Sequence, residues 1–234
     1  FGSSGLVGGH LLNQLIKDIN YSKIKLFVRS VPENSDPKVE IIKTDFNNLQ
    51  NHKEDIKGDD CFVCIGTTKK NAPDKDEYKR VELDIPKEIA KIAKSNLVNS
   101  FIFVSALYAN PKSSGDYVKF KGLVEEELKE LNFSKLGIMR PSFLLGDRKE
   151  KRVGEKIGIF VFKLLSPLLL GPLKKMIPIH SETVAKAMVK SMNNGSLYSM
   201  DTLLSRVYGK PKEQVDVQQD TKIEVVFVDG KTIL

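Results

Sequence analysis

The chain has 234 residues, of which 41% are hydrophobic and 29% charged, and its net charge is +7. This length and apolar content are enough for one domain with a buried core, which excludes global disorder. Basic residues alternate with acidic ones, so the positive excess indicates a solvated surface, and no nucleic-acid partner is expected.

Three glycines at regular spacing lie at the start of the chain. Gly2 and Gly5 precede, and Gly8 lies near the start of, a run with helical apolar spacing over residues 6–19. Between a strand and a helix, such glycines let the turn close and let backbone N–H groups contact a pyrophosphate. A flexible Gly/Ser terminus is the alternative, since the spacing alone is weak evidence. Only Phe1 stands where the preceding strand belongs, so we expect the first strand to be largely missing.

Strand-like and helix-like segments then alternate. The expected strands are residues 23–29, 38–46, 59–68, 100–106 and 135–146, and the expected helices after the first are residues 84–96, 117–131 and 180–195. This order predicts an α/β domain with a doubly wound parallel sheet. Pro86 after Asp84 indicates a helix start, and Ser181 and Gly195 are the expected cap and end of the last helix.

The two cysteines have the spacing of half a zinc or redox site. However, Cys61 and Cys64 fall in the predicted strand 59–68, where side chains three apart point to opposite faces. We therefore expect two separate buried thiols, no metal site and a reducing, cytoplasmic location.

The longest apolar stretch covers residues 157–173. It is shorter than the ~20 residues of a spanning helix and is interrupted by Lys163, Pro167 and Pro172. We expect a buried helix or a hydrophobic lid over a substrate and no transmembrane segment, with peripheral membrane contact as the alternative.

The tail, residues 195–234, differs from the rest. It is polar until residues 223–234, where Asp229-Gly230 has the sequence of a two-residue β-hairpin turn. Residues 208–217 resemble the C-terminal end of phage small terminase subunits, which raises the hypothesis of a foreign junction near residues 195–205. We divide the chain into a domain of residues 1–194 and this atypical tail.

Three residues have the chemistry of a proton-transfer site. Tyr117 and Lys121 are four apart at a helix start, so they share one face. A nearby cation lowers the pKa of a phenol, which lets a tyrosine exchange a proton with a carbonyl or hydroxyl group. Ser105 ends the preceding strand, where it could hydrogen-bond the same substrate oxygen. Four of the six tyrosines have a lysine four residues later, but only Tyr117 opens a long helix after a strand that ends in serine.

A further basic residue bears on the choice of dinucleotide. Arg29 ends the strand after the glycine-rich segment, 21 positions beyond Gly8. An acid there would bind the ribose 2′-hydroxyl of NAD, whereas an arginine suits the 2′-phosphate of NADP. The sequence therefore favours NADP over NAD, with an ordinary exposed arginine as the alternative.

The segments GSSGLVG, CIGTTKKNA, YVKFKGLVEEEL and IMRPSFLLGDRKEKRVGE together resemble the atypical short-chain dehydrogenase/reductases, in the group of the Tat-interacting protein. The similarity covers roughly residues 2–194 and implies a Rossmann fold that binds NADP(H). It implies a catalytic set of Ser105, Tyr117 and Lys121, and a cofactor-binding set of Gly2, Ser3, Ser4, Gly5, Leu6, Val7, Gly8, Arg29, Asp45, Gly66, Thr67, Arg140 and Pro141.

The members of the cofactor set have different expected places. Carried over by position, residues 2–8 form the pyrophosphate loop and Asp45 lies beside the adenine. Gly66 and Thr67 line the cofactor, and Arg140 and Pro141 close the nicotinamide side.

Two functions follow from this sequence. The first is an NADP-dependent oxidoreductase acting on the carbonyl or alcohol of an apolar small molecule. The second is an NADPH-binding regulator with little catalysis. A nucleic-acid-associated protein is a third hypothesis, which rests on the charge and the terminase-like tail alone. No feature of the sequence fixes an oligomeric state.

Overall fold

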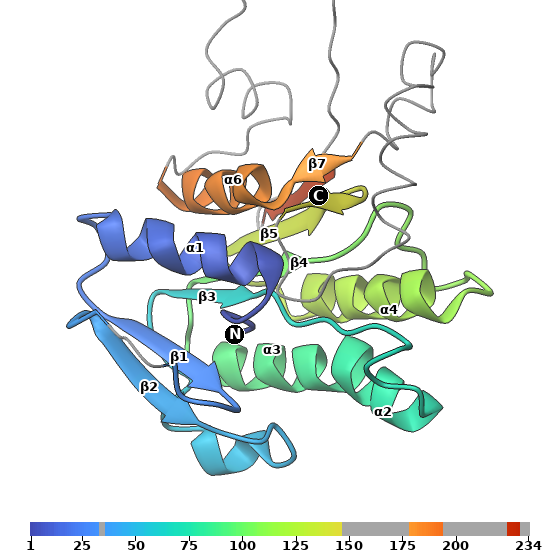
Figure 1. Cartoon of the computed structure of the whole chain (residues 1–234), viewed down its shortest axis with the longest axis horizontal. Helices are drawn as coiled ribbons and strands as arrows, with labels where there is room; N and C mark the ends of the chain where they lie inside the picture. The colour runs from blue at the N-terminus through green and yellow to red at the C-terminus, as the bar shows by residue number, and fades with distance from the viewer. Residues whose placement is uncertain (33–35, 147–177, 194–223, 230–234) are drawn as a thin grey trace, which may run out of the picture.

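Parallel strands lie between two layers of helices in the part of the chain that the computed structural model describes, residues 1–32, 36–146, 178–193 and 224–229 (Figure 1). Strand β1 (Ile24–Val28) pairs in parallel with β2 (Val39–Lys43). Strands β3 (Asp60–Val63), β4 (Ser100–Val104) and β5 (Lys135–Arg140) form a second parallel group. The short strands β6 (Leu144–Leu145) and β7 (Ile179–His180) also pair in parallel. The predicted α/β class with parallel strands is confirmed.

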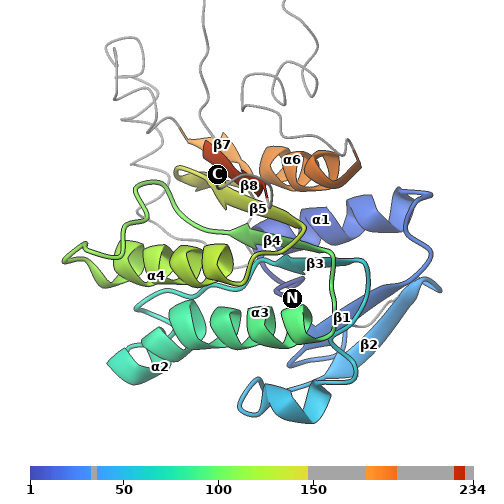
Figure 2. The same cartoon turned by 180° about the vertical axis from the view of Figure 1, so that it is seen from behind.

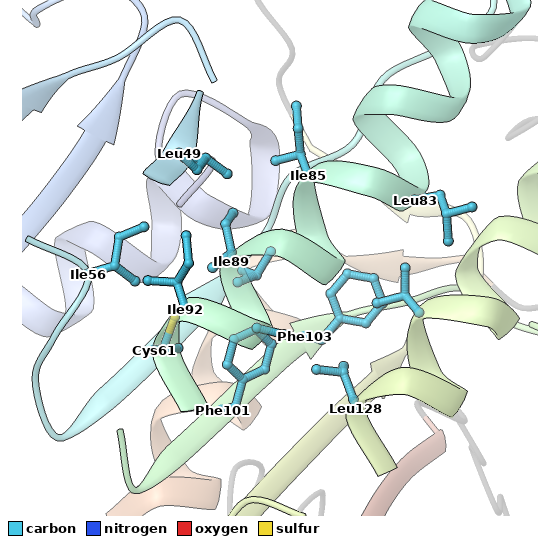
Figure 3. Packing of buried hydrophobic residues seen from close by; sticks show 14 of the residues in the cluster. Leu49, Ile56, Cys61, Leu83, Ile85, Ile89, Ile92, Phe101, Phe103 and Leu128 are labelled. Carbon is cyan, nitrogen blue, oxygen red and sulfur yellow. The ribbon is translucent and has the colours of Figure 1, made fainter. Parts of the chain in front are cut away.

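The helices cover both faces of these strands, as a doubly wound sheet requires. Helices α1 (Leu6–Lys17) and α6 (Ser181–Asn193) lie on one face, and α3 (Ile85–Ser95) and α4 (Asp116–Glu130) on the other (Figures 1 and 2). Each face has its own buried apolar cluster because successive strand side chains alternate between faces. In β4, Phe101 and Phe103 join the cluster beneath α3 and α4 (Figure 3), whereas Ile102 joins the one beneath α1 and α6.

The two cysteines follow the same alternation. Cys61 is buried in the cluster of the α3 face, and Cys64 packs against the cluster of the α1 face. Burial raises the pKa of the Cys61 thiol to about 12 and that of Cys64 to about 11, so both remain protonated at neutral pH. The predicted separation of the two thiols is confirmed.

The helix before β4 begins nine residues earlier than the start expected at Asp84. Helix α2 (Lys75–Lys79) runs through a π-helical turn η2 (Arg80–Asp84) directly into α3. The Asp74 carboxylate caps α2 by accepting from the backbone N–H groups of Asp76 and Glu77. Pro86 has no N–H to donate to the carbonyl four residues earlier, and the wider π turn lies at that place. The helix α3 itself begins at Ile85 with Asp84 at its N-cap position and Pro86 in its first turn, as expected, whereas α2 and η2 before it were not predicted.

The chain start lies where a further strand would pair. The Phe1 amino group donates to the Phe62 carbonyl oxygen at 2.8 Å, and the Cys64 N–H donates to the Phe1 oxygen at 2.9 Å. This is the bonding of one residue in a parallel ladder. Behind Phe1, a groove of about 260 Å³ lies between α1, β1 and β3, and no described strand occupies it. We call it the strand groove.

The tail contributes one described strand. β8 (Glu224–Asp229) pairs antiparallel with β5, with Arg140 opposite Glu224. The second arm of the expected hairpin, after Gly230, lies outside the described residues, as do the expected lid segment and Gly195. Within the described residues the Ser181 hydroxyl has no hydrogen-bond partner, so the cap expected for α6 is not formed.

Candidate cofactor and active site

The glycine loop, residues 2–8, leads from Phe1, which is hydrogen-bonded alongside β3, into the first turn of α1. Gly2 has φ +83°, a left-handed conformation that favours glycine, and its carbonyl oxygen accepts from the Gly5 N–H at 3.0 Å. Gly5 is the N-cap of α1; it offers no side-chain cap, and the first turn contains no acidic residue. The N–H groups of this turn and the positive end of the helix dipole therefore suit a pyrophosphate.

Replacing Gly8 by alanine is expected to weaken dinucleotide binding at least about tenfold, the scale of small geometric changes at a binding site. A Cβ on Gly8 would lie 2.1 Å from the Gly2 oxygen, so the loop backbone would have to move. Gly9→Ala is the matched control, because its Cβ would approach nothing closer than the Ser3 oxygen at 3.5 Å. Fluorescence titration with NADPH measures both variants, and equal affinities would contradict this role of Gly8.

Arg29 and Asp45 lie at neighbouring strand ends. Arg29 directly follows β1 and is exposed, and Asp45 follows β2 two positions after its last residue, Lys43. The Thr44 N–H donates to the Val28 oxygen at 2.9 Å, which extends the β1–β2 pairing to this edge. Hydrogen bonds from the backbone and side chain of Asn47 lower the pKa of Asp45. This edge therefore has a cationic and an anionic side chain at the places expected for the adenosine half of the cofactor.

Tyr117 and Lys121 share one face of α4, as predicted. Tyr117 is the second residue of the helix and 43% exposed, whereas Lys121 is buried. The Lys121 Nζ atom lies 6.0 Å from the centre of the Tyr117 ring and 4.8 Å from that of Phe103. The site therefore combines an accessible phenol with a buried cation one helical turn away.

A buried carboxylate holds this lysine. The Lys121 Nζ atom lies 3.0 Å from Glu82 Oε2 and donates to the Ile65 oxygen at 3.3 Å. Burial, the largest single influence, lowers the pKa of Lys121, but the charges of Glu82 and Tyr117 outweigh it, and the net direction is upward. Lys121 is therefore an ammonium ion at neutral pH.

The loop after β3 reaches the same carboxylate. The Thr67 N–H donates to Glu82 Oε1 at 2.5 Å, and a Cβ on Gly66 would lie 3.5 Å from that oxygen. Gly66 and Thr67, predicted to line the cofactor, thus lie beside the Lys121–Glu82 pair. The structure brings these four residues and Tyr117 together.

Ser105 and Arg140 belong to a second buried network. The Ser105 hydroxyl donates to Glu125 Oε1, and the Arg140 guanidinium binds both oxygens of Glu125. Glu125 lies on α4 two turns beyond Tyr117. The Pro141 carbonyl oxygen accepts from the Leu107 N–H at 3.0 Å, which links the loops after β4 and β5. The catalytic role of Ser105 and the cofactor role of Arg140 remain predictions.

Sequence reasoning missed both buried glutamates. Neither Glu82 nor Glu125 has a motif, and each looks like a charge on a solvated helix face. The start of the helix that carries Glu82 was predictable from the sequence, since Asp74 and Glu77 have the spacing of a capping box. Among the described residues, no group of three or more His, Cys, Asp or Glu side chains could hold a metal ion.

A glycine loop at a helix N-terminus beside parallel strand ends defines a dinucleotide-binding α/β domain. Residues 2–194 match the family described as NAD(P)H-binding, and the chain belongs to this family. The chain is 31% identical to protein FMP52-1 of Scheffersomyces stipitis, over 70% of this chain and 74% of that protein. It is 34% identical to protein HTATIP2 of Rattus norvegicus, over 66% of this chain but only 65% of that protein.

Solved structures show the same fold. MoeE5 in complex with UDP-glucuronic acid and NAD has a TM-score of 0.62 at 16% identity, over 85% of this chain and 72% of that one. The Bordetella bronchiseptica enzyme WbmH in complex with NAD⁺ has a TM-score of 0.61 at 14% identity, over 81% and 69% of the two chains.

The names of the relatives also bear on location. FMP52-1 of S. stipitis and FMP52 of Candida glabrata are both named mitochondrial, which does not fit the cytoplasmic location expected from the sequence. No helix among the described residues is long and apolar enough to cross a membrane.

Proposed function

We propose that the protein is an NADP(H)-dependent oxidoreductase that acts on a carbonyl or alcohol group of an apolar small molecule. The observation that carries this proposal is the pairing of the accessible Tyr117 with the buried Lys121 ammonium on one face of α4. Family membership supports a nicotinamide dinucleotide, and the apolar sequence of residues 157–173 supports an apolar substrate.

The proposed chemistry divides between cofactor and protein. When bound, the nicotinamide supplies the hydride to the carbonyl carbon or accepts it from the alcohol carbon. The Tyr117 hydroxyl gives its proton to the carbonyl oxygen during reduction and takes it back during oxidation. The Lys121 ammonium stabilises the tyrosinate that remains after the proton has left. Ser105 is proposed to orient the substrate oxygen.

A titration and a turnover assay test this function together. NADPH and NADH are titrated by fluorescence, and NADPH oxidation is then followed across a broad panel of aldehydes and ketones. Binding with turnover of at least one apolar carbonyl compound is the expected result. Saturable NADPH binding without any turnover would contradict catalysis and favour the NADPH-binding regulator. Absence of both would contradict the cofactor assignment.

The preference for NADP depends on Arg29. Arg29→Ala is expected to weaken NADPH binding about 10- to 100-fold and to leave NADH affinity unchanged, because only NADPH carries the 2′-phosphate. Lys53→Ala is the control, since Lys53 is an exposed basic residue after η1 (Leu49–His52) that does not belong to the predicted cofactor-binding set. Isothermal titration with both dinucleotides gives the ratio of the NADPH affinity to the NADH affinity. An equal loss for NADPH and NADH would contradict a 2′-phosphate contact.

A further inference from the structure

Glu82 combines two features that rarely occur without a cause. It is a carboxylate with no exposed surface, and it lies in the middle of the π-helical turn η2. Buried carboxylates are costly unless paired, and single π turns inside helices are frequent at functional sites. Both features belong to η2, the element that faces Lys121.

The carboxylate of Glu82 contacts two parts of the site at once. One oxygen accepts from the Thr67 N–H in the loop predicted to line the cofactor, and the other pairs with the Lys121 ammonium on α4. We propose that Glu82 is a positioning residue of the redox site, whose buried carboxylate holds the Lys121 ammonium beside Tyr117 and fixes the Thr67 loop against α4. This inference rests on the proposed function.

The contacts of the Lys121 head group support this role. An ammonium group has three N–H donors. The Ile65 carbonyl oxygen accepts from one of them at 3.3 Å, and Glu82 Oε2 forms an ion pair with the same group at 3.0 Å. The Lys121 Nζ atom lies 6.0 Å from the centre of the Tyr117 ring. Glu82 and the Ile65 carbonyl oxygen therefore fix the position of the Lys121 head group beside the Tyr117 ring.

The charge balance around Lys121 gives a pH signature. The groups that face it are Glu82 from η2, Tyr117 from α4 and Cys64 from the segment after β3, and all three raise the pKa of Lys121 against burial. In Glu82→Gln the burial remains and the strongest opposing charge is gone, so the pKa of Lys121 falls. Lys121 then loses its proton at lower pH, and the tyrosinate loses its support on the alkaline side of the profile.

The central experiment compares Glu82→Gln with wild type over pH 6 to 10. The alkaline limb of kcat/KM with NADPH is expected to move to lower pH by at least about one unit, the usual effect of one adjacent charge. The deficit should therefore be small near pH 6 and grow with pH, whereas a merely structural defect would lower the rate equally at every pH. Glu82→Asp keeps the charge on a shorter side chain, so its alkaline limb should move in the same direction by a smaller amount.

Glu127→Gln is the matched control. Glu127 lies on α4, the helix of Lys121, and pairs with Lys87 at 2.6 Å and Lys91 at 3.2 Å, but neither lysine belongs to the site. This variant loses an equally close carboxylate–lysine pair and should keep the wild-type pH profile. A shift as large as that of Glu82→Gln would overturn the proposal.

A second readout needs no turnover. The ¹³Cε resonance of Lys121, assigned by its loss in Lys121→Arg, is titrated in wild type and Glu82→Gln. The expected result is a midpoint at least about one pH unit lower in Glu82→Gln; equal midpoints would overturn the proposal even if no substrate is ever turned over. If Glu82→Gln does not fold, Glu82→Asp decides: its shorter carboxylate should lower the midpoint by a smaller amount, and an unchanged midpoint would contradict the proposal.

Discussion

Tyr117→Phe is expected to lower NADPH-dependent turnover by about 10²- to 10⁴-fold, the usual contribution of a positioned proton donor. The change removes one oxygen atom and keeps the aromatic ring 6.0 Å from the Lys121 Nζ atom. The affinity for NADPH should fall by less than about tenfold, because at most one neutral hydrogen bond is lost. Steady-state kinetics with NADPH and the best carbonyl substrate, together with a fluorescence titration, separate the two effects.

Tyr108→Phe is the control for this experiment. Tyr108 is also followed by a lysine four residues later, and it is 55% exposed, but it lies in a loop with φ +62° and not on a helix. Its loss should leave turnover unchanged. If Tyr117→Phe retained all measurable turnover, or if both variants lost the same amount, Tyr117 would not be the proton donor.

The period of a helix made the relation between Tyr117 and Lys121 predictable. Two side chains four residues apart share a face wherever α4 lies in the fold, so the sequence was sufficient. The opposite directions of Cys61 and Cys64 followed in the same way from the alternation of side chains along a strand. The class of fold followed from the order of strands and helices, because parallel strands need helical crossovers.

The partners of the site residues could not be predicted by such rules. Glu82 is 39 residues from Lys121, and Glu125 is 20 from Ser105. These pairs exist because η2 and β4 pack against α4, and no local periodicity encodes such packing. The π turn adds a second difficulty, since it shifts the helical phase before Pro86 and changes which side of the helix is buried.

Filling the strand groove with an added strand is expected to have a large effect on the free energy of unfolding. An apolar segment of five alternating Val and Ile residues joined to Phe1 is expected to raise the free energy of unfolding by several kcal/mol. Each fully buried side chain of this size contributes about 1.5–3 kcal/mol, against about 1.5 kcal/mol per residue for ordering. Backbone hydrogen bonds to β1 and β3 add about 1 kcal/mol each. At roughly 2–4 °C per kcal/mol, the Tm should rise by about 10 °C.

The geometry specifies where this segment would pair. Phe1 already bonds to Phe62 and Cys64, so the added residues continue along β3 in the parallel direction. The Ile24 N–H donates to the Lys38 oxygen on the side of β2, and because bonding alternates along a strand, the N–H groups of Lys25 and Phe27 face the groove. Central parallel strands are covered on both faces, which is why every added residue is apolar.

A five-residue Gly/Ser extension is the matched control, because it also converts the Phe1 ammonium to an amide but buries no apolar surface. Thermal and urea unfolding give the stability of both extended chains. Hydrogen exchange supplies the local test, since only the apolar strand should slow exchange at the amides of Lys25, Phe27 and Phe62. Equal Tm values and equal exchange for the two extensions would show that the groove does not accept a strand.

The glycine loop directly follows Phe1, so a strand bound in the groove should also tighten NADPH binding, whereas the Gly/Ser extension should not.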